Sequence, residues 1–264
     1  MAIRGAMSGL SPLELTFSSF PTLSSEPQRL FLYVTLENYV HETWMRFYCA
    51  LTKKMKGEML AKLRDFSITP KEIQMEIEQI LGPYNCSIQV EYFRSNTISP
   101  GNIAALIQKY NRHPYQRVVK AVYVDYLDLL QPDEKAEMYR LDLGAITSRL
   151  KIISASFEIP IITATQLNRE AYRKEKEKEF GIETVSESIQ KVFIADFGAV
   201  IQRVKNPENG SNGDQPLKPV KAILKVEKNR DGKTGKTNLY FDYPRFRILT
   251  NEEYMDEFGE VMKI

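Results

Sequence analysis

The chain has 264 residues, of which 43% are hydrophobic and 27% are charged, and its formal net charge is +2. This composition is ordinary for a globular protein, and the small net charge gives no strong overall attraction to nucleic acid. Two cysteines, Cys49 and Cys86, with only two histidines, exclude a disulfide framework and argue against a structural zinc cage. There is no apolar run of about 18 residues and no signal peptide, so we expect a cytoplasmic protein without a membrane partner.

From residue 30 onward, strand patterns alternate with helix patterns. In chain order they predict a strand over 30–36, a helix over 40–59, a helix that begins at 69–72, a strand over 87–93 and a helix that begins at 99–100. The second of these helices has the clearest start, because Thr69-Pro70-Lys71-Glu72 is a capping box with proline at the first helical position. Asn38 is a candidate N-cap for the first helix.

The alternation continues to residue 165 and then changes. Residues 118–124 predict a buried strand, residues 132–157 a long helix that begins at Pro132-Asp133-Glu134, and residues 161–165 a further strand. This repeated order predicts an α/β fold with a mostly parallel sheet and right-handed crossovers. Beyond residue 199 the strands are joined by turns instead, which predicts a C-terminal antiparallel β extension of the sheet.

Two polar side chains lie at or just past the ends of the two strands that flank the long helix. Asp125 ends the first strand and Gln166 follows the second. The carboxyl ends of parallel strands lie at one edge of a sheet, where ligands bind, so we expect these side chains to lie close together. An acid beside an amide suits a metal-bound nucleotide phosphate, although an aspartate alone more often simply terminates a strand.

Five motifs, in this order, resemble the RecA-like motor domain of DnaB-type hexameric replicative DNA helicases, particularly those of phages. They are YVTLE at 33–37, VYVDY at 122–126, TATQLNR at 163–169, SES at 186–188 followed by Ala195-Asp196, and KNRDG at 228–232. The resemblance spans residues 30–246. It implies a RecA-like fold, ATP and Mg²⁺ as cofactors, single-stranded DNA as a partner and a homohexameric ring, and it suggests primase or other replisome proteins as further partners.

The resemblance also implies roles for individual residues. Glu37 corresponds to the catalytic carboxylate that orients the attacking water, Asp125 to the acid that holds the Mg²⁺ of Mg-ATP, and Gln166 to the sensor of the γ-phosphate. Arg230, together with Lys228, corresponds to the finger that reaches the nucleotide of the next subunit. Two alternatives stay open: Glu37 as a cap of the following helix, and the two basic residues as a solvated strand face.

The segment 169–183 is dense in charge, with five residues of each sign. In the family that it resembles, this region contacts the DNA backbone, which makes its basic residues candidates for DNA binding: Arg169, Arg173, Lys174, Lys176 and Lys178. Their balance with acidic residues argues against a strong intrinsic DNA site, and a solvated helix is the alternative.

A motor of this family needs a phosphate loop of the form G-x-x-x-x-G-K-[ST], and no segment of the chain has that pattern. The nearest segment is 5–11, where Leu10 stands in place of the lysine, so Ser11 is only a weak candidate for nucleotide binding. We therefore expect residues 1–27 to be atypical and poorly ordered, and residues 28–264 to form the RecA-like domain. The alternative function is a non-hydrolysing helicase-derived fragment, or an assembly or regulatory partner.

Overall fold

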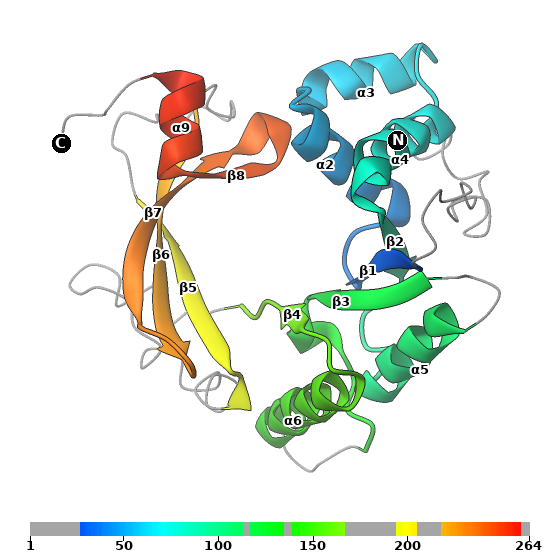
Figure 1. Ribbon diagram of the computed structural model, residues 1–264, viewed down its shortest axis with the longest axis vertical. Coiled ribbons are helices and arrows are strands. Elements are labelled where there is room, and N and C mark those ends of the chain that lie inside the picture. Colours follow the sequence, from blue (N-terminus) through cyan, green and yellow to red (C-terminus); the bar gives the residue numbers. More distant parts are fainter. Residues whose placement is uncertain (1–26, 113–116, 135–138, 167–193, 205–217, 260–264) are drawn as a thin grey trace. The chain divides into compact units, whose positions relative to one another are not determined.

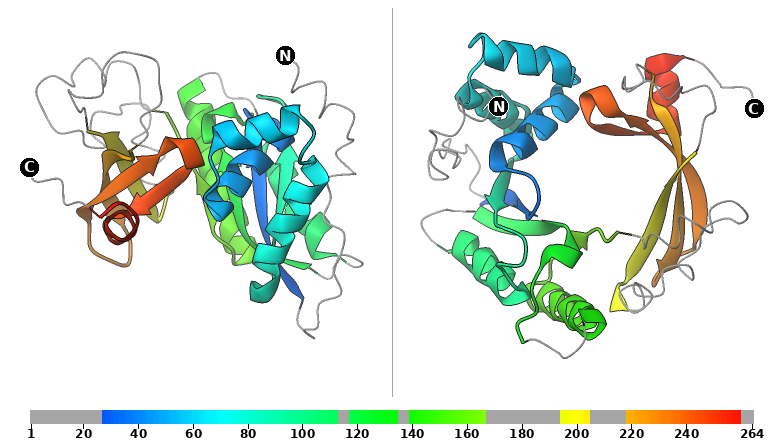
Figure 2. Two further views of the ribbon diagram at one scale, coloured as in Figure 1. Left: turned by 90° about the horizontal axis from the view of Figure 1, so that it is seen from above. Right: turned by 180° about the vertical axis from the view of Figure 1, so that it is seen from behind.

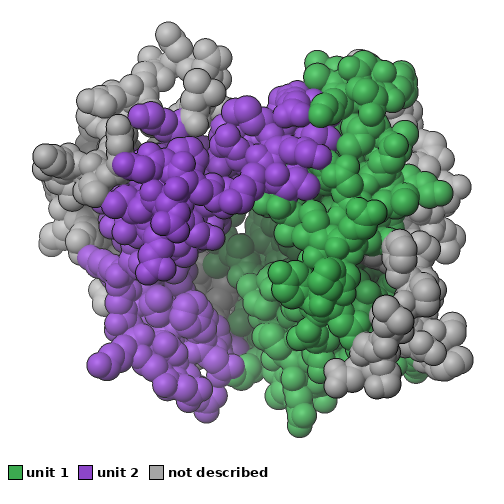
Figure 3. All heavy atoms as spheres, turned by 45° about the horizontal axis from the view of Figure 1, so that its top comes forward, with its two compact units in different colours: residues 1–51, 60–166 green, residues 52–59, 167–264 purple. Residues whose placement is uncertain are grey.

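The computed structural model describes residues 27–112, 117–134, 139–166, 194–204 and 218–259 (Figure 1). The chain divides into two compact units, coloured separately in Figure 3: residues 1–51 with 60–166, and residues 52–59 with 167–264. The described part of each unit contains one four-stranded sheet. The predicted antiparallel extension is therefore a sheet of its own among the described residues, rather than a continuation of the parallel one.

The sheet of the first unit is parallel throughout and has the strand order β2-β1-β3-β4. Its strands are β1 (Gln28–Thr35), β2 (Cys86–Tyr92), β3 (Arg117–Asp125) and β4 (Ile161–Thr163). Each strand is reached from the previous one through helical chain, as the alternating pattern predicts. The mostly parallel α/β fold expected from the sequence is confirmed.

Helices cover both faces of this sheet. They are α2 (Val40–Thr52), α4 (Pro70–Leu81), α5 (Pro100–Asn111) and α6 (Tyr139–Phe157), and a further helix, α3 (Lys56–Arg64), lies between α2 and α4 in the chain. Figures 1 and 2 show α5 and α6 on one face and α2 and α4 on the other. The largest buried cluster lies between the strands and the first of these layers, and it includes Leu30, Leu32, Val34, Ile103, Ile107, Val119, Val122, Ile146 and Leu150. Burial of these side chains fixes which face of each strand points inward.

Helix α4 begins at the predicted capping box. The Glu72 amide donates to Thr69 Oγ1, and the Thr69 amide donates to Glu72 Oε2 at 2.7 Å. The apolar face of the helix is buried through Ile73 and Ile77. Local signals were sufficient here because both caps lie within one turn of the chain.

The predicted single helix over 40–59 is wrong, because the chain breaks into α2 and α3. Lys53 has a left-handed backbone with φ of 59°. Its carbonyl accepts a hydrogen bond from Arg245 Nε at 3.1 Å, a contact from far along the chain that helix spacing does not reveal. Asn38 is also not the N-cap of α2. The helix begins at Val40, so Tyr39 holds the N-cap position, and its amide donates to Glu42 Oε2 at 3.2 Å.

The predicted start of α6 at residue 132 is wrong as well. Residues 133–134 form a bend, and the described helix spans Tyr139–Phe157. Asp133 instead serves the N-terminus of α5, where its Oδ1 accepts hydrogen bonds from the Gly101 amide at 3.0 Å and from the Ser99 hydroxyl. A residue typical of a helix start thus caps a different helix.

The second unit has an antiparallel sheet of strand order β5-β6-β7-β8. Its strands are β5 (Phe197–Arg203), β6 (Val220–Asn229), β7 (Gly235–Asp242) and β8 (Arg247–Thr250), and helix α9 (Asn251–Phe258) follows them. Tyr254 of α9 stacks on Tyr240 of β7, with ring centroids 3.9 Å apart, and Leu249 completes this small core. The aromatic contact holds α9 on the sheet.

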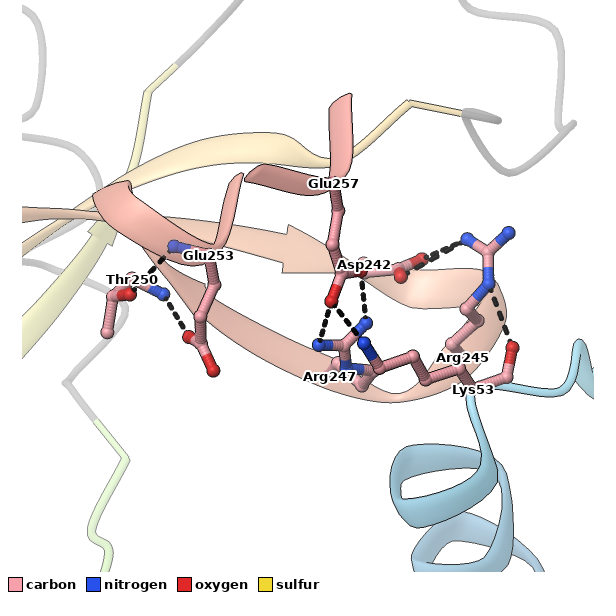
Figure 4. Close-up of polar contacts among 7 residues, drawn as sticks. All are labelled: Lys53, Asp242, Arg245, Arg247, Thr250, Glu253 and Glu257. Carbon is pink, nitrogen blue, oxygen red and sulfur yellow. Dashed lines mark hydrogen bonds and ion pairs between the residues drawn. The ribbon is translucent and has the colours of Figure 1, made fainter. Parts of the chain in front are cut away.

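A polar network joins residue 53 to the C-terminal part of the same unit (Figure 4). Glu257 of α9 accepts from Lys53 Nζ at 2.6 Å and from Arg247 Nη1 and Nη2 at 2.6 and 2.8 Å. These hydrogen bonds, with that from Arg247 the larger influence, lower the pKa of Glu257 to about 2. Beneath them, the fully buried Asp242 accepts from Arg245 Nη1 at 3.2 Å.

None of the helices within the described ranges combines the length and the apolar character that crossing a bilayer requires.

Candidate functional site

Three strand ends meet at the carboxyl edge of the parallel sheet. Thr35 at the end of β1 lies opposite Asp125 at the end of β3, and the Leu36 amide donates to the Asp125 carbonyl at 2.9 Å. Glu37 follows directly, so the two acids leave neighbouring strands. The exit of β4 joins the same edge, because the Leu127 amide donates to the Ala164 carbonyl at 3.1 Å.

Neutral donors hold the carboxylate of Asp125. The Tyr33 hydroxyl donates to Oδ2 at 2.9 Å, and Asn38 Nδ2 approaches the same oxygen at 3.5 Å. Burial and, after it, the nearby charge of Asp125 raise the pKa of Tyr33, which keeps that hydroxyl a donor. Within the described ranges Asp125 has no ion-pair partner, and its Oδ1 accepts no hydrogen bond. The half-buried acid therefore suits a cation.

Tyr126 lies among the three predicted site residues of this edge. Burial raises the pKa of its hydroxyl, and the charges of Glu37, Asp128 and Asp125 act in the same direction. A hydrogen bond from the side chain of Gln166 acts in the opposite direction. Glu37, Asp125 and Gln166, far apart in the sequence, thus all influence one hydroxyl at this edge.

Glu37 is exposed, and no hydrogen bond or ion pair engages its carboxylate within the described part of the chain. Glu37 was a candidate to cap α2, but Glu42 caps that helix instead, since its side chain accepts from the Tyr39 amide. The geometry therefore leaves the Glu37 carboxylate available beside Asp125.

Sequence reasoning missed Asp128, which lies in the 3-10 helix η2 (Leu127–Leu129) after β3. Its Oδ2 accepts from Thr165 Oγ1 at 2.7 Å and from the Gln166 amide at 3.1 Å. The one signal was its position three residues after Asp125, which places it at the same edge. Its partners lie after another strand, so the contact itself was not visible in the pattern.

Lys228 and Arg230 belong to the second unit, so their place relative to this edge is not defined. Strand β6 ends at Asn229, and Arg230 lies in the turn that follows, which corrects its assignment to the strand face of Lys228. The guanidinium of Arg230 pairs with Asp196 Oδ1 at 3.0 Å, and both side chains are more than half exposed, at 68% and 52%. Exposed ion pairs are weak, so another anion can compete for this arginine.

Several candidates lie outside the described residues. They are Ser11 and the basic residues Arg169, Arg173, Lys174, Lys176 and Lys178, together with the segment 1–26. Their roles stay predictions.

Comparison with known proteins decides the family. The model of the DnaB-like helicase C-terminal domain matches residues 17–248. The chain belongs to this family. A curated protein from Guillardia theta, named as a probable replicative DNA helicase, is 40% identical over 48 residues, which are 18% of this chain and 8% of that protein.

Solved structures show the same fold. A DnaB-like replicative helicase, described with its interactions with primase, has a TM-score of 0.64 and 18% sequence identity over 84% of this chain. A second structure, that of an ATPase domain, has a TM-score of 0.65 and 19% identity over 84% of this chain and 74% of its own. The chain spans half the length of the first of these structures, at 50%. The resemblance to DnaB-type motor domains and the RecA-like fold are confirmed.

Proposed function

We propose that this chain is the motor domain of a replicative helicase, in which ATP hydrolysis drives translocation along single-stranded DNA and unwinding of the duplex. The observation that carries the proposal is that the chain segments bearing Glu37, Asp125 and Gln166 are hydrogen-bonded together at the carboxyl edge of a parallel sheet. Family membership gives this edge its chemical context. A base, a metal-binding acid and an amide are the groups that hydrolysis of a nucleoside triphosphate uses.

Asp125 is the residue that would hold Mg²⁺. In the described ranges no group of three or more histidine, cysteine, aspartate or glutamate residues could hold a metal by itself. Magnesium usually retains waters and binds one or two carboxylates together with substrate phosphates, so a single acid with a free oxygen fits an ion that arrives with the nucleotide. The ion, when bound, neutralises charge on the β- and γ-phosphates.

Glu37 acts as the base in this proposal. It is exposed, lies just past the end of β1, the strand that pairs with the strand of Asp125, and is not committed to capping α2. A carboxylate in that position can accept a hydrogen bond from a water molecule and orient it toward the γ-phosphate. Gln166, which lies just past β4, senses that phosphate through its side-chain amide in this proposal.

Arg230 and Lys228 act on the nucleotide of an adjacent subunit in this proposal, which makes hydrolysis depend on a homohexameric ring. The exposed turn position of Arg230 and its weak pair with Asp196 support a side chain that changes partners. Single-stranded DNA is the polymer on which the motor moves, with the basic residues of 169–178 as its contacts. Primase is a further partner, as described for one structurally similar helicase.

A second candidate function is a non-hydrolysing subunit that assembles with a helicase ring. The feature that favours it is the missing G-x-x-x-x-G-K-[ST] pattern, because the backbone amides and lysine of that loop supply most of the contacts to the phosphates. In that case the acids at the sheet edge are inherited from an active motor.

Titration calorimetry with Mg-ATP separates the two candidates. The measurement compares the full chain with Asp125→Ala and with Asp65→Ala, a matched control that removes an exposed aspartate from the turn after α3. We expect binding in the micromolar range for the full chain and the control, weakened at least about tenfold by Asp125→Ala. Steady-state ATP hydrolysis, with and without single-stranded DNA, then tests the motor itself. Absence of binding at millimolar Mg-ATP would leave the non-hydrolysing subunit as the function.

A further inference from the structure

Strand β4 is short, and the chain beyond it depends on contacts with the end of β3. Among the described residues, β4 pairs with Val122, Tyr123 and Val124 alone. After the strand, the Thr163 hydroxyl donates to the Val124 carbonyl at 2.9 Å, and the Leu127 amide donates to the Ala164 carbonyl at 3.1 Å. These two hydrogen bonds with the end of β3 and the turn after it fix the path of residues 163 and 164. Neither of them involves Gln166.

The last part of that path is held by one carboxylate. Asp128 Oδ2 accepts from the Thr165 hydroxyl at 2.7 Å and from the Gln166 amide at 3.1 Å. Hydrogen bonds to an ionised acceptor are the stronger kind, and here both converge on one oxygen. The position of the Gln166 backbone is thus set by Asp128 more than by the sheet ladder, which has ended at Thr163.

The segment that carries Asp128 begins next to Asp125, because the helical turn η2 starts directly after Tyr126. Burial and then the charges of Glu37, Asp128 and Asp125 raise the pKa of the Tyr126 hydroxyl, and the side chain of Gln166 acts to lower it. The backbone hydrogen bond to Asp128 is therefore the geometric constraint that the structure shows on Gln166.

We propose that Asp128 is a positioning residue for Gln166. It anchors the backbone of the residue that senses the γ-phosphate, so that the sensor keeps a fixed place at the sheet edge that carries Asp125. Asp128 itself touches neither nucleotide nor metal in this proposal, because its Oδ2 is used by Thr165 and Gln166. The role of Gln166 as a γ-phosphate sensor rests on the proposed function. The anchoring of its backbone by Asp128 does not depend on ATP hydrolysis.

Amide exchange measured by NMR on the full chain, labelled with ¹⁵N-glutamine, tests the anchoring directly. We expect the Gln166 amide to exchange roughly tenfold faster in Asp128→Ala than in the wild type, because a hydrogen bond to a charged acceptor is lost. Thr165→Val, which removes the other donor, should accelerate exchange less, and Thr165→Ser should restore the wild-type rate.

Asp65→Ala is the matched control for this measurement. Asp65 also accepts from one amide and one hydroxyl, both of Ser67, in an exposed turn after α3. Its loss should leave the Gln166 amide unchanged. Equal exchange of the Gln166 amide in wild type and in Asp128→Ala overturns the proposal. If Asp128→Ala does not fold, Thr165→Val against Thr165→Ser decides the same question.

A second measurement asks whether the anchoring acts through the sensor. Affinity for Mg-ATP and kcat for its hydrolysis are compared in Asp128→Ala, Gln166→Ala and the double variant. We expect Asp128→Ala to lower kcat about tenfold with a smaller change in KM, and to have no further effect in the Gln166→Ala background. Additive effects overturn the positioning role. A chain that binds no Mg-ATP contradicts the proposed function instead, and the exchange rates then decide the anchoring alone.

Discussion

At the scale of single residues, the candidate site depends on the neighbour of Asp125. This acid accepts from the Tyr33 hydroxyl at 2.9 Å and, among the described residues, from no cation. A neutral donor orients the carboxylate without cancelling its charge, which in the proposed function stays available for Mg²⁺. The same contact links the stability of the unit to pH, because burial and then Asp125 raise the pKa of Tyr33.

Substitution Tyr33→Phe should lower the free energy of unfolding by about 1 kcal/mol at pH 7, since the partly buried hydrogen bond to Asp125 is lost. The raised pKa of Tyr33 adds stability that is fully present below the unfolded tyrosine value of about 10 and is lost as the pH rises beyond it. Above that pH the wild type should therefore lose stability more steeply than the variant.

Urea denaturation between neutral pH and about pH 11 measures both effects. Tyr84→Phe is the matched control, because Tyr84 is 66% exposed and its hydroxyl makes no contact with Asp125. Parallel stability curves for the wild type and Tyr33→Phe would contradict the assignment.

At the scale of elements, long-range contacts override local helix signals. The helix pattern over 40–59 is continuous, yet Lys53 leaves the helical conformation, and its carbonyl and ammonium bind Arg245 and Glu257. Asp133 similarly leaves its own helix and caps α5. By contrast, Thr69 and Glu72 form their capping box as predicted, and no distant partner in the described part of the chain competes for them.

Substitution Glu257→Gln should lower the free energy of unfolding of the second unit by up to about 1 kcal/mol at neutral pH, since the group is partly solvated and ion pairs at the surface are weak. The pKa of Glu257 is lowered to about 2, so its contribution is present above the unfolded glutamate value and is lost as the pH falls through about 2. The difference between wild type and variant should therefore shrink toward acid.

Chemical denaturation followed at several pH values tests this, with Glu252→Gln as control. Glu252 lies in the first turn of the same helix α9, so the substitution removes the same charge without touching Lys53 or Arg247. A gap between wild type and Glu257→Gln that stays constant down to a pH of about 2 would falsify the network as its cause.

At the scale of the whole molecule, the proposed function divides its groups between two units. Glu37, Asp125 and Gln166 belong to the first, and Lys228 and Arg230 to the second. A finger that serves a neighbouring subunit makes each nucleotide site a shared one, so activity becomes a property of the assembly.

Mixing two inactive variants tests this sharing. Asp125→Ala lacks the metal-binding acid and Arg230→Ala lacks the finger, so each alone should hydrolyse ATP at no more than about a hundredth of the wild-type rate. In an equal mixture, about a quarter of the interfaces join an intact acid to an intact finger, and a matching part of the activity should return. A mixture as inactive as its components would place Arg230 outside the shared site.

The candidate site was partly visible in the sequence. Asp125 and Gln166 were found because they lie at or just past the ends of two apolar strands, and strand ends of a parallel sheet share an edge. Glu37 was found from the motif that resembles the helicase family. Tyr33 and Asp128 were missed because their role is a contact with a neighbouring strand or with the chain that follows one. Arg230 was found from its motif, but its position in a turn and its pair with Asp196 were not.

The sequence by itself determined the order of strands and helices, the parallel character of the first sheet, the cap of α4 and the family. The elements, the sheet and the cap depend on hydrophobic period and on contacts within a few residues, and the family was recognised from the resemblance of five motifs. Only the tertiary structure decided the break at Lys53, the use of Asp133 on α5, the separate antiparallel sheet and the anchoring of Gln166 by Asp128. Each of these is a contact between segments distant in the chain, and its energy exceeds a local preference that is worth only a few tenths of a kcal/mol to about 1 kcal/mol per residue.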